Sequence, residues 1–359
     1  MLRDTNVTNL VMGLLITYSF VFLDGLALLA LPRLRISYGG DRLPFFSLSF
    51  LRGIIFIFWF IILRAILINH PFAKQQVDSQ PYPLFQTPVL LLFATNILLL
   101  AFVIYIFFIG PTQISVTHIR VIDPNLNQPV RIVQLSDIHV ERTSLRELAL
   151  PGLVSSLHPD MILMTGDYLN ESYKRSQASQ QDLRDLIAQL HAPLGIYAVN
   201  GNVESRLNMD DLLKGLDIHL IDNEVIKIPQ LGDHFVLLGL EYNVWYEDEV
   251  VLKNLMSTIS PDDFTILLYH KSDLAYTAQD LGINLYLTGH THGGQFRLPF
   301  YGALITDSRY NKKFEKGLYI LGNTTMYVSA GLGMAGGVAP RIRFLCPPEV
   351  VVIDLVPSK

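Results

Sequence analysis

The stretch Leu285-Tyr-Leu-Thr-Gly-His-Thr-His-Gly-Gly-Gln295 joins a short apolar run to two histidines that stand two residues apart. The run Leu285–Thr288 has the length and composition of a buried strand, and a glycine after it is typical of a strand end. In extended backbone, residues i and i+2 point the same way, so His290 and His292 are predicted to aim both imidazoles into one site. Thr291 between them is predicted to point elsewhere. The sequence therefore raises the hypothesis of a metal site at the end of a strand.

Four other short apolar runs are followed in the same way by a residue that can bind a metal. They are Val130–Leu135 before D137-I-H139, Met161–Met164 before G166-D167, Gly195–Val199 before G201-N202, and Phe264–Tyr269 before His270. Taken alone, Asp137 would be interpreted as a helix cap, His270 as a satisfied histidine and Asn202 as a turn residue. Their coincidence at five strand ends favours a shared site. Two ligand pairs with i, i+2 spacing fit two adjacent metals better than one.

Beyond Gly110-Pro111, short apolar runs alternate with amphipathic stretches. This alternation over about 245 residues predicts one α/β domain with its chemistry in loops at the carboxyl ends of strands. Besides the five runs above, strands are predicted at Ile114–Val121, Phe235–Leu240, Met326–Ser329 and Val350–Leu355. Helices are predicted at Leu145–Leu157, Gln181–Leu190, Met209–Leu216, Glu249–Met256 and Asp273–Gly282.

The first third of the chain is strongly apolar, in a protein in which 50% of the residues are hydrophobic. Three runs of about 20 residues are each long enough to cross a hydrocarbon core of about 30 Å as helices. They are residues 10–31, 45–68 and 89–109. We therefore predict a membrane anchor over residues 1–111 and a catalytic domain over residues 112–359.

The distribution of basic residues predicts the orientation of this anchor. Four arginines lie on the side that also holds the C-terminal domain, and two basic residues lie near span ends on the other. The four are Arg33, Arg35, Arg42 and Arg120, and the two are Arg3 and Lys74. By the positive-inside rule the catalytic domain is cytoplasmic, in an integral protein that we expect in the plasma membrane.

The net charge and the cysteine content exclude some classes of binding partner and of metal site. The formal net charge is −5 and no basic run is present, so nucleic acid is not an expected partner. Cys346 is the single cysteine, which excludes an intramolecular disulfide framework and a cysteine-rich metal site.

The ordered set D-x-H, GD, GN, H and GHTH resembles the calcineurin-like metallophosphoesterase family. The match runs from about Val130 to Leu355, and GHTHGGQ at 289–295 is its most specific element. The segments Y327-V-S-A-G-L-G333 and P348-E349 resemble a membrane-associated branch of that family. The resemblance implies an αββα sandwich, in which two central β-layers are flanked by helices and the metals lie at the strand ends.

The resemblance also assigns the ligands of a binuclear centre. It gives one metal to Asp137, His139 and His292, the second to Asn202, His270 and His290, and Asp167 to both as a bridge. Oxygen ligands mixed with imidazole suit two divalent transition-metal ions such as Mn²⁺, Fe²⁺ or Zn²⁺. Two such ions about 3.5–4 Å apart lower the pKa of a bound water and orient a phosphoryl group for in-line attack. Asp167, Asn202 and His292 are the residues that we expect to be most directly catalytic.

Three residues near these ligands are expected to surround them without binding metal: Asn170, Val203 and Glu204. Asn170 stands where the family often has a second aspartate. Val203 stands where the family has a histidine beside the ligand asparagine, and some members, including the UDP-diacylglucosamine pyrophosphatases, also lack it. The loss removes a candidate acid for the leaving group. The alternative is that Val203 only packs at the sheet edge while Glu204 caps the following helix.

These observations predict a membrane-anchored binuclear phosphoesterase. Only about 25 residues separate the third apolar run from Asp137, so a membrane-proximal or lipid-linked phosphoester is an attractive substrate. One alternative is a hydrolase of a lipid-linked pyrophosphate of the UDP-diacylglucosamine type. Another is a non-catalytic phosphate-binding scaffold on a membrane anchor. A transporter or channel has little support, because three helices offer few polar groups to line a pore.

Overall fold

The computed structural model describes residues 22, 51–59, 61–62, 83–242, 247–335 and 341–358, and of residues 83–93 the backbone only. Contacts divide the chain into two compact units, Met1–Phe108 and Ile109–Lys359.

One helix in the described part of the chain is long and apolar enough to cross a membrane. The α-helix α4 (Pro83–Ile104) continues through a π-helical turn, η2 (Tyr105–Ile109), and a 3₁₀ turn, η3 (Gly110–Thr112). By length and composition, the candidate span within it is Ala94–Thr112. It covers most of the third span predicted from the sequence, residues 89–109.

The other two predicted spans fall largely on residues that the structure does not describe. Of residues 45–68, the described parts 51–59 and 61–62 are helical, and of residues 10–31 only residue 22 is described. The three-helix anchor therefore stays a prediction.

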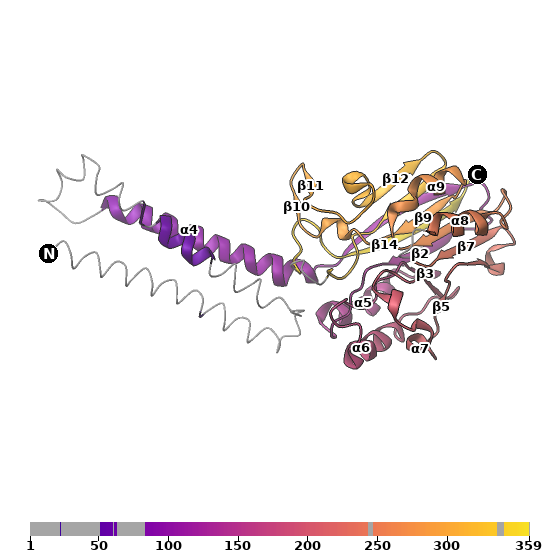
Figure 1. The fold of residues 1–359 in the computed structure, drawn as a ribbon, viewed down its shortest axis with the longest axis horizontal. Helices are drawn as coiled ribbons and strands as arrows, with labels where there is room; N and C mark the ends of the chain where they lie inside the picture. The colour runs from indigo at the N-terminus through magenta and orange to yellow at the C-terminus, as the bar shows by residue number, and fades with distance from the viewer. Residues whose placement is uncertain are drawn as a thin grey trace, which may run out of the picture. The chain divides into compact units, whose positions relative to one another are not determined.

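The second unit is built on two six-stranded sheets (Figure 1). The first sheet has the order β1 (Ser115–Asp123), β14 (Glu349–Pro357), β2 (Val130–Leu135), β3 (Met161–Met164), β4 (Ile196–Ala198), β5 (His219–Leu220). The second has the order β12 (Gly317–Leu321), β13 (Thr324–Val328), β9 (Leu285–Thr288), β8 (Phe264–Tyr269), β7 (Phe235–Leu240), β6 (Glu224–Lys227). Strands β2, β3 and β4 are parallel, as are β8, β9 and β13, so the carboxyl ends in each set share one edge.

Side chains from both sheets form one apolar core between them. Ile132 on β2 and Leu163 on β3 share a cluster with Ile266 on β8 and Leu285 on β9, and all four are fully buried. Burial of such a side chain contributes roughly 1.5–3 kcal/mol, so this shared layer holds the two sheets face to face.

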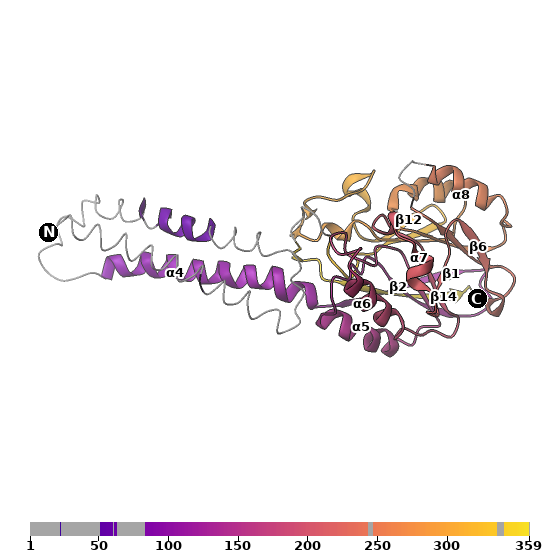
Figure 2. The same ribbon diagram turned by 60° about the horizontal axis from the view of Figure 1, so that its bottom comes forward.

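Helices cover the outer face of each sheet, in line with the period-2 alternation of the strands. Outward residues of the first sheet, such as Val133, pack with α5 (Leu145–Ser156), α6 (Gln177–Ile187) and α7 (Met209–Leu213). Outward residues of the second sheet, such as Leu267, pack with α8 (Asp248–Met256) and α9 (Ala275–Asp280). Figures 1 and 2 show the two helix groups on opposite sides of the sheets. The predicted αββα sandwich is confirmed.

Most predicted elements appear within a few residues of their expected limits. The helix predicted at Gln181–Leu190 begins earlier, because the Ser176 side chain caps it by accepting from the Ser179 amide. The helix predicted at Asp273–Gly282 divides into the 3₁₀ turn η6 (Ser272–Leu274) and α9. Elements without a sequence prediction are short: β5, β6, β12, the pair β10 (Arg297–Leu298) and β11 (Gly302–Ala303), and the turns η4 (Glu204–Arg206), η5 (Pro229–Leu231), η7 (His292–Gly294) and η8 (Asn311–Phe314).

Candidate metal centre

The side chains predicted as ligands converge at the carboxyl ends of the two sheets and form two groups. One group of candidate metal-binding side chains is Asp137, His139 and His292, and the other is Asp167, His270 and His290. Each group takes residues from both sheets, since Asp137, His139 and Asp167 follow β2 or β3 whereas His270, His290 and His292 follow β8 or β9.

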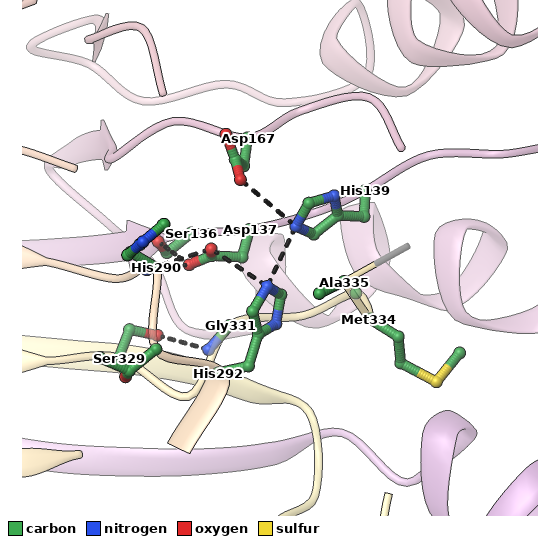
Figure 3. A network of polar contacts seen from close by, with 12 residues as sticks. Ser136, Asp137, His139, Asp167, His290, His292, Ser329, Gly331, Met334 and Ala335 are labelled. Carbon is green, nitrogen blue, oxygen red and sulfur yellow. Dashed lines mark hydrogen bonds and ion pairs between the residues drawn. The ribbon is translucent and has the colours of Figure 1, made fainter. Parts of the chain in front are cut away.

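In the first group, the donor atoms face one another (Figure 3). His139 Nε2 lies 3.0 Å from His292 Nε2, and His292 Nε2 lies 3.4 Å from Asp137 Oδ1. In the second group, His270 Nε2 lies 3.1 Å from His290 Nδ1. It also lies 3.1 Å from Asn202 Oδ1, so the asparagine predicted to complete this group is in place.

Asp167 stands between the two groups. Its Oδ2 atom lies 3.5 Å from His139 Nε2 in the first group and 3.3 Å from His270 Nε2 in the second. No other described carboxylate pairs with imidazole rings of both groups, since Asp137 pairs with the His292 ring but reaches His290 only through its backbone amide. This is the position that a bridging ligand requires.

The spacing of these atoms fits bound cations. A transition metal with bonds of about 2.0–2.1 Å to nitrogen holds neighbouring donors about 3.0–3.4 Å apart. The contacts from His139 Nε2 to His292 Nε2 and to Asp167 Oδ2 are 3.0 and 3.5 Å. Two buried imidazole nitrogens that face each other at 3.0 Å share at most one proton, so a cation between them satisfies both lone pairs.

The backbone of the ligand loops corrects one prediction. The i, i+2 pairs were expected to be extended, yet the ligand residues adopt left-handed φ angles: Asp137 +49°, His139 +48°, Asp167 +56°, His290 +67° and His292 +50°. This conformation costs a non-glycine residue about 1–2 kcal/mol, and its concentration at one site is typical of functional geometry.

The consequence is that His290 and His292 do not serve the same group. The turn between them sends His290 towards His270 and His292 towards His139. Thr291 points elsewhere, as predicted, since its hydroxyl donates to the carbonyl of Glu315. Ile138 also points away and is buried in the apolar cluster under α5.

Two glycines allow the GD and GN loops to touch. A Cβ on Gly166 would lie 2.6 Å from the Gly201 amide nitrogen, and a Cβ on Gly201 would lie 2.3 Å from Asp167 Oδ1. Gly166 also has φ +93°, which disfavours any side chain. Glycine is therefore required at both positions to bring Asp167 and Asn202 to one place.

The site concentrates buried ionisable groups. Although burial raises it, the pKa of Asp167 is held far below its usual range by the positive charge of His270. Burial lowers the pKa of His139 and of His292, which favours the neutral imidazole that binds a metal. Burial opposes protonation of His270, but the charge and hydrogen bond of Asp167 raise its pKa to about 9.

Glu204 fastens the two loops that carry Asp167 and Asn202. Its buried carboxylate accepts from the amides of Asp167 at 2.9 Å, Tyr168 at 2.9 Å and Gly201 at 3.1 Å. All three of these amides precede η4, and the next helix, α7, is capped by the Asn208 side chain, so the alternative that Glu204 caps the following helix is wrong. Burial and the charge of Asp167 raise the pKa of Glu204 to about 7.

Val203 is buried beside the second group. It is 2% exposed, and its amide donates to Asp167 Oδ1 at 2.9 Å. The backbone at this position thus fixes the oxygen of Asp167 that does not face the histidines. The aliphatic side chain brings no proton donor to this place.

Asn170 connects the GD loop to the glycine-rich segment near the C-terminus. Its Nδ2 donates to the Met334 carbonyl at 3.2 Å, and its Oδ1 accepts from Arg341 at 3.1 Å. Arg341 in turn pairs with Glu141 at 3.0 Å. An amide can donate and accept here, whereas an aspartate could not donate to the carbonyl.

Sequence reasoning did not identify Asp307, whose carboxylate lies 3.4 Å from His290 Nε2. His290 directs Nδ1 towards the second group, so Asp307 faces the opposite ring nitrogen and can orient the imidazole. Asp307 does not follow a predicted strand, so the sequence pattern that identified the other residues does not include it. Only its position in the folded chain relates it to the site.

Known proteins resemble this chain over the same region. Residues 130–294 match the sequence profile described as calcineurin-like phosphoesterase. Over 243 residues the chain is 35% identical to the uncharacterized metallophosphoesterase YkuE of Bacillus subtilis, covering 63% of this chain and 78% of that protein.

Two further relatives have informative descriptions. The transmembrane protein with metallophosphoesterase domain of Bos taurus is 33% identical over 63% of this chain and 54% of its own length. The UDP-2,3-diacylglucosamine pyrophosphatase LpxG of Chlamydia trachomatis is 24% identical over 62% of this chain and 83% of its own length.

Proposed function

This chain belongs to the calcineurin-like phosphoesterases and is a metal-dependent phosphoric ester hydrolase, and from that premise we propose that it is a membrane-anchored enzyme with a binuclear centre. The observation that carries the proposal is the position of Asp167, which contacts a histidine of each ligand group. We assign one ion to Asp137, His139 and His292, the other to Asn202, His270 and His290, and Asp167 to both.

The chain's own residues would hold the two ions to which the substrate phosphoryl group binds. When bound, two divalent ions supply an activated water and neutralise charge on the phosphoryl oxygens. Asp167 fixes the separation of the two groups, because one of its oxygens contacts both and the Val203 amide restrains the other. His139 and His292 are buried, which excludes bulk water from the first group.

We further propose that residues 1–111 anchor the enzyme in the plasma membrane and that residues 112–359 act in the cytoplasm. The apolar helix Ala94–Thr112 and the name of the bovine relative support an anchor. The arginine asymmetry supports the orientation.

For the substrate, we propose a lipid-linked or membrane-proximal phosphoester. The specific observation in favour of a lipid-linked pyrophosphate is the similarity to LpxG, whose name gives such an activity for that protein. The non-catalytic scaffold has less support, because every predicted ligand is present and converges.

Metal content tests the proposal. The purified full-length protein is expected to hold about two transition-metal ions per chain and to hydrolyse an aryl phosphodiester or phosphomonoester with Mn²⁺. Elemental analysis and a chromogenic assay measure both, with chelator-treated protein as the control. A chain that binds no metal and hydrolyses nothing across monoesters, diesters and pyrophosphates would contradict it.

Val203 predicts a dependence on the leaving group. General-acid catalysis typically accelerates a reaction about 10²–10⁴-fold. An alkoxide leaving group depends on it more than a phenolate or a phosphate does. We expect the parent enzyme to hydrolyse aryl esters and to lose rate steeply as the leaving-group pKa rises. Val203→His is expected to improve alkyl esters selectively, with Val203→Leu as the matched control. Equal effects of Val203→His on both ester types would identify Val203 as a packing residue.

A further inference from the structure

A hairpin of exposed apolar side chains follows the GHTH ligands in the chain. Strands β10 and β11 pair antiparallel and leave the tip Pro299-Phe300-Tyr301. Phe300 is 111% exposed and Ile305 is 81% exposed. Leu298, Tyr301 and Leu304 are also exposed. Apolar side chains gathered in this way, unlike scattered ones, mark an interaction surface. Figure 1 shows the hairpin at the end of the phosphoesterase unit away from the C-terminus.

The conformation of the tip is unusual for its residue. Phe300 has φ +63°, a left-handed angle at which a hairpin tip ordinarily carries glycine or asparagine. A fully exposed phenylalanine gains no burial within the chain to offset this strain. The side chain is therefore better explained by what it contacts outside the chain than by folding.

The segment that carries this apolar tip is basic, and one of its lysines contacts the tip. Between residues 296 and 316 the chain has five basic and two acidic side chains, although the whole protein has a net charge of −5. Lys312 Nζ lies 3.3 Å from the ring centre of Tyr301, and it also donates to the Tyr301 carbonyl at 2.5 Å. Arg309 and Lys313 follow in the chain and are exposed, but Lys313 contacts Tyr276 on α9 and not the tip. An apolar tip backed by cations matches the interface of a bilayer that contains anionic lipid.

The same segment adjoins the metal centre. It begins directly after the turn that carries His292, and a Cβ on Gly294 would lie 2.4 Å from Ala303 Cβ, so β11 packs on that turn. It leads to Asp307, which contacts His290. A membrane surface bound by this hairpin would therefore be linked through the chain to His292 of the first ligand group and to His290 of the second.

We propose that residues 296–305 form a docking hairpin that inserts Phe300 and Ile305 into the surface of an anionic bilayer, with Lys312 at the lipid phosphates. This goes beyond the proposed hydrolase: it adds a second membrane contact, within the catalytic unit, to the anchor. In a symmetric contact between two copies the basic side chains of the two hairpins would face each other and repel, so the charge favours an anionic phospholipid surface.

The docking is tested on the full-length protein in lipid nanodiscs, without any assay of activity. The native Cys346 is 1% exposed, so the parent protein should take up little thiol-reactive dye. A polarity-sensitive dye is attached at Phe300→Cys, and at Val250→Cys as the control. Val250 is 60% exposed on α8, which lies far from the hairpin in both views (Figures 1 and 2).

We expect spin-labelled lipid to quench the dye at position 300 and not at position 250. Quenching should be stronger in discs of phosphatidylcholine with phosphatidylglycerol than in phosphatidylcholine alone, and should weaken with added salt. Equal, weak quenching at the two positions would overturn the proposal, as would quenching that ignores lipid charge. If the dye at position 300 became shielded from water as the protein concentration rose, without any dependence on lipid, the proposal would also be overturned. The hairpin would then bind a second copy of this chain.

A second variant separates docking from folding. Phe300→Asn removes the apolar ring and keeps a residue that tolerates the left-handed angle, so the hairpin should retain its conformation. With the dye at Ile305→Cys, this change is expected to lower the docked-to-undocked ratio about tenfold, as lipid quenching reports. Unchanged quenching at 305 would overturn the role of Phe300. A failure of these tests leaves metal content and hydrolysis unaffected, so it is distinguishable from a failure of the proposed function.

Discussion

Asp167→Asn is expected to lower kcat/KM for an aryl phosphodiester at least about a thousandfold, the largest effect of any single ligand change. Asparagine keeps the shape of the side chain but removes the charge that both ligand groups share. The retained volume means that the buried site need not collapse. Metal content measured on the same preparation is expected to fall below that of the parent.

The control for this variant is Asp262→Asn, which removes the same charge at an exposed position before β8. It should leave both activity and metal content near those of the parent. If Asp167→Asn retained two ions and most of its activity, the assignment of Asp167 as the bridge would be wrong. Loss of one ion with only partial loss of activity would also contradict a shared role.

Glu204→Ala is expected to destabilise the fold by about 3–5 kcal/mol, because four buried backbone amides, including that of Leu169, lose their acceptor. For a unit of this size that corresponds to a fall of roughly 10 °C in the melting temperature. Thermal unfolding of metal-free protein measures the effect, so that metal loss does not contribute. Activity should also fall, since the loops that carry Asp167 and Asn202 are no longer fastened.

Glu171→Ala is the matched control, since Glu171 is an exposed residue of the same loop region that pairs with Lys174. The Glu171 carboxylate is half exposed, so its ion pair contributes about 0–1 kcal/mol and the melting temperature of this variant should stay close to that of the parent. If the two variants unfolded at the same temperature, Glu204 would have no special part in holding the loops.

The αββα sandwich was predictable because its central strands are local apolar runs with clear ends. The strands Val130–Leu135, Met161–Met164 and Leu285–Thr288 have the predicted limits. They are central strands, buried on both faces, and that burial makes each run uniformly apolar. The edge strand Gly317–Leu321 alternates in exposure, so its apolar pattern is weaker.

The residues of the candidate centre were also identified from sequence, but not its geometry. The side chains at five strand ends meet because parallel strands bring their carboxyl ends to one edge. The left-handed backbone at Asp137 and His290 was not predicted, since local sequence favours glycine or asparagine for that conformation. Asp307 and the fastening role of Glu204 depend on contacts between segments far apart in the chain, which spacing along the chain does not encode.

Each ligand group draws residues from both sheets, so metal bound at the proposed centre would have a role during folding as well as in catalysis. His139 and His292 are 153 positions apart, so their meeting requires the two halves of the sandwich to have closed on each other. A partly folded chain offers each ion only half of its donors. Metal retention would thus report complete folding, and each ion of the proposed centre would act as a removable cross-link whose binding energy stabilises the native state alone.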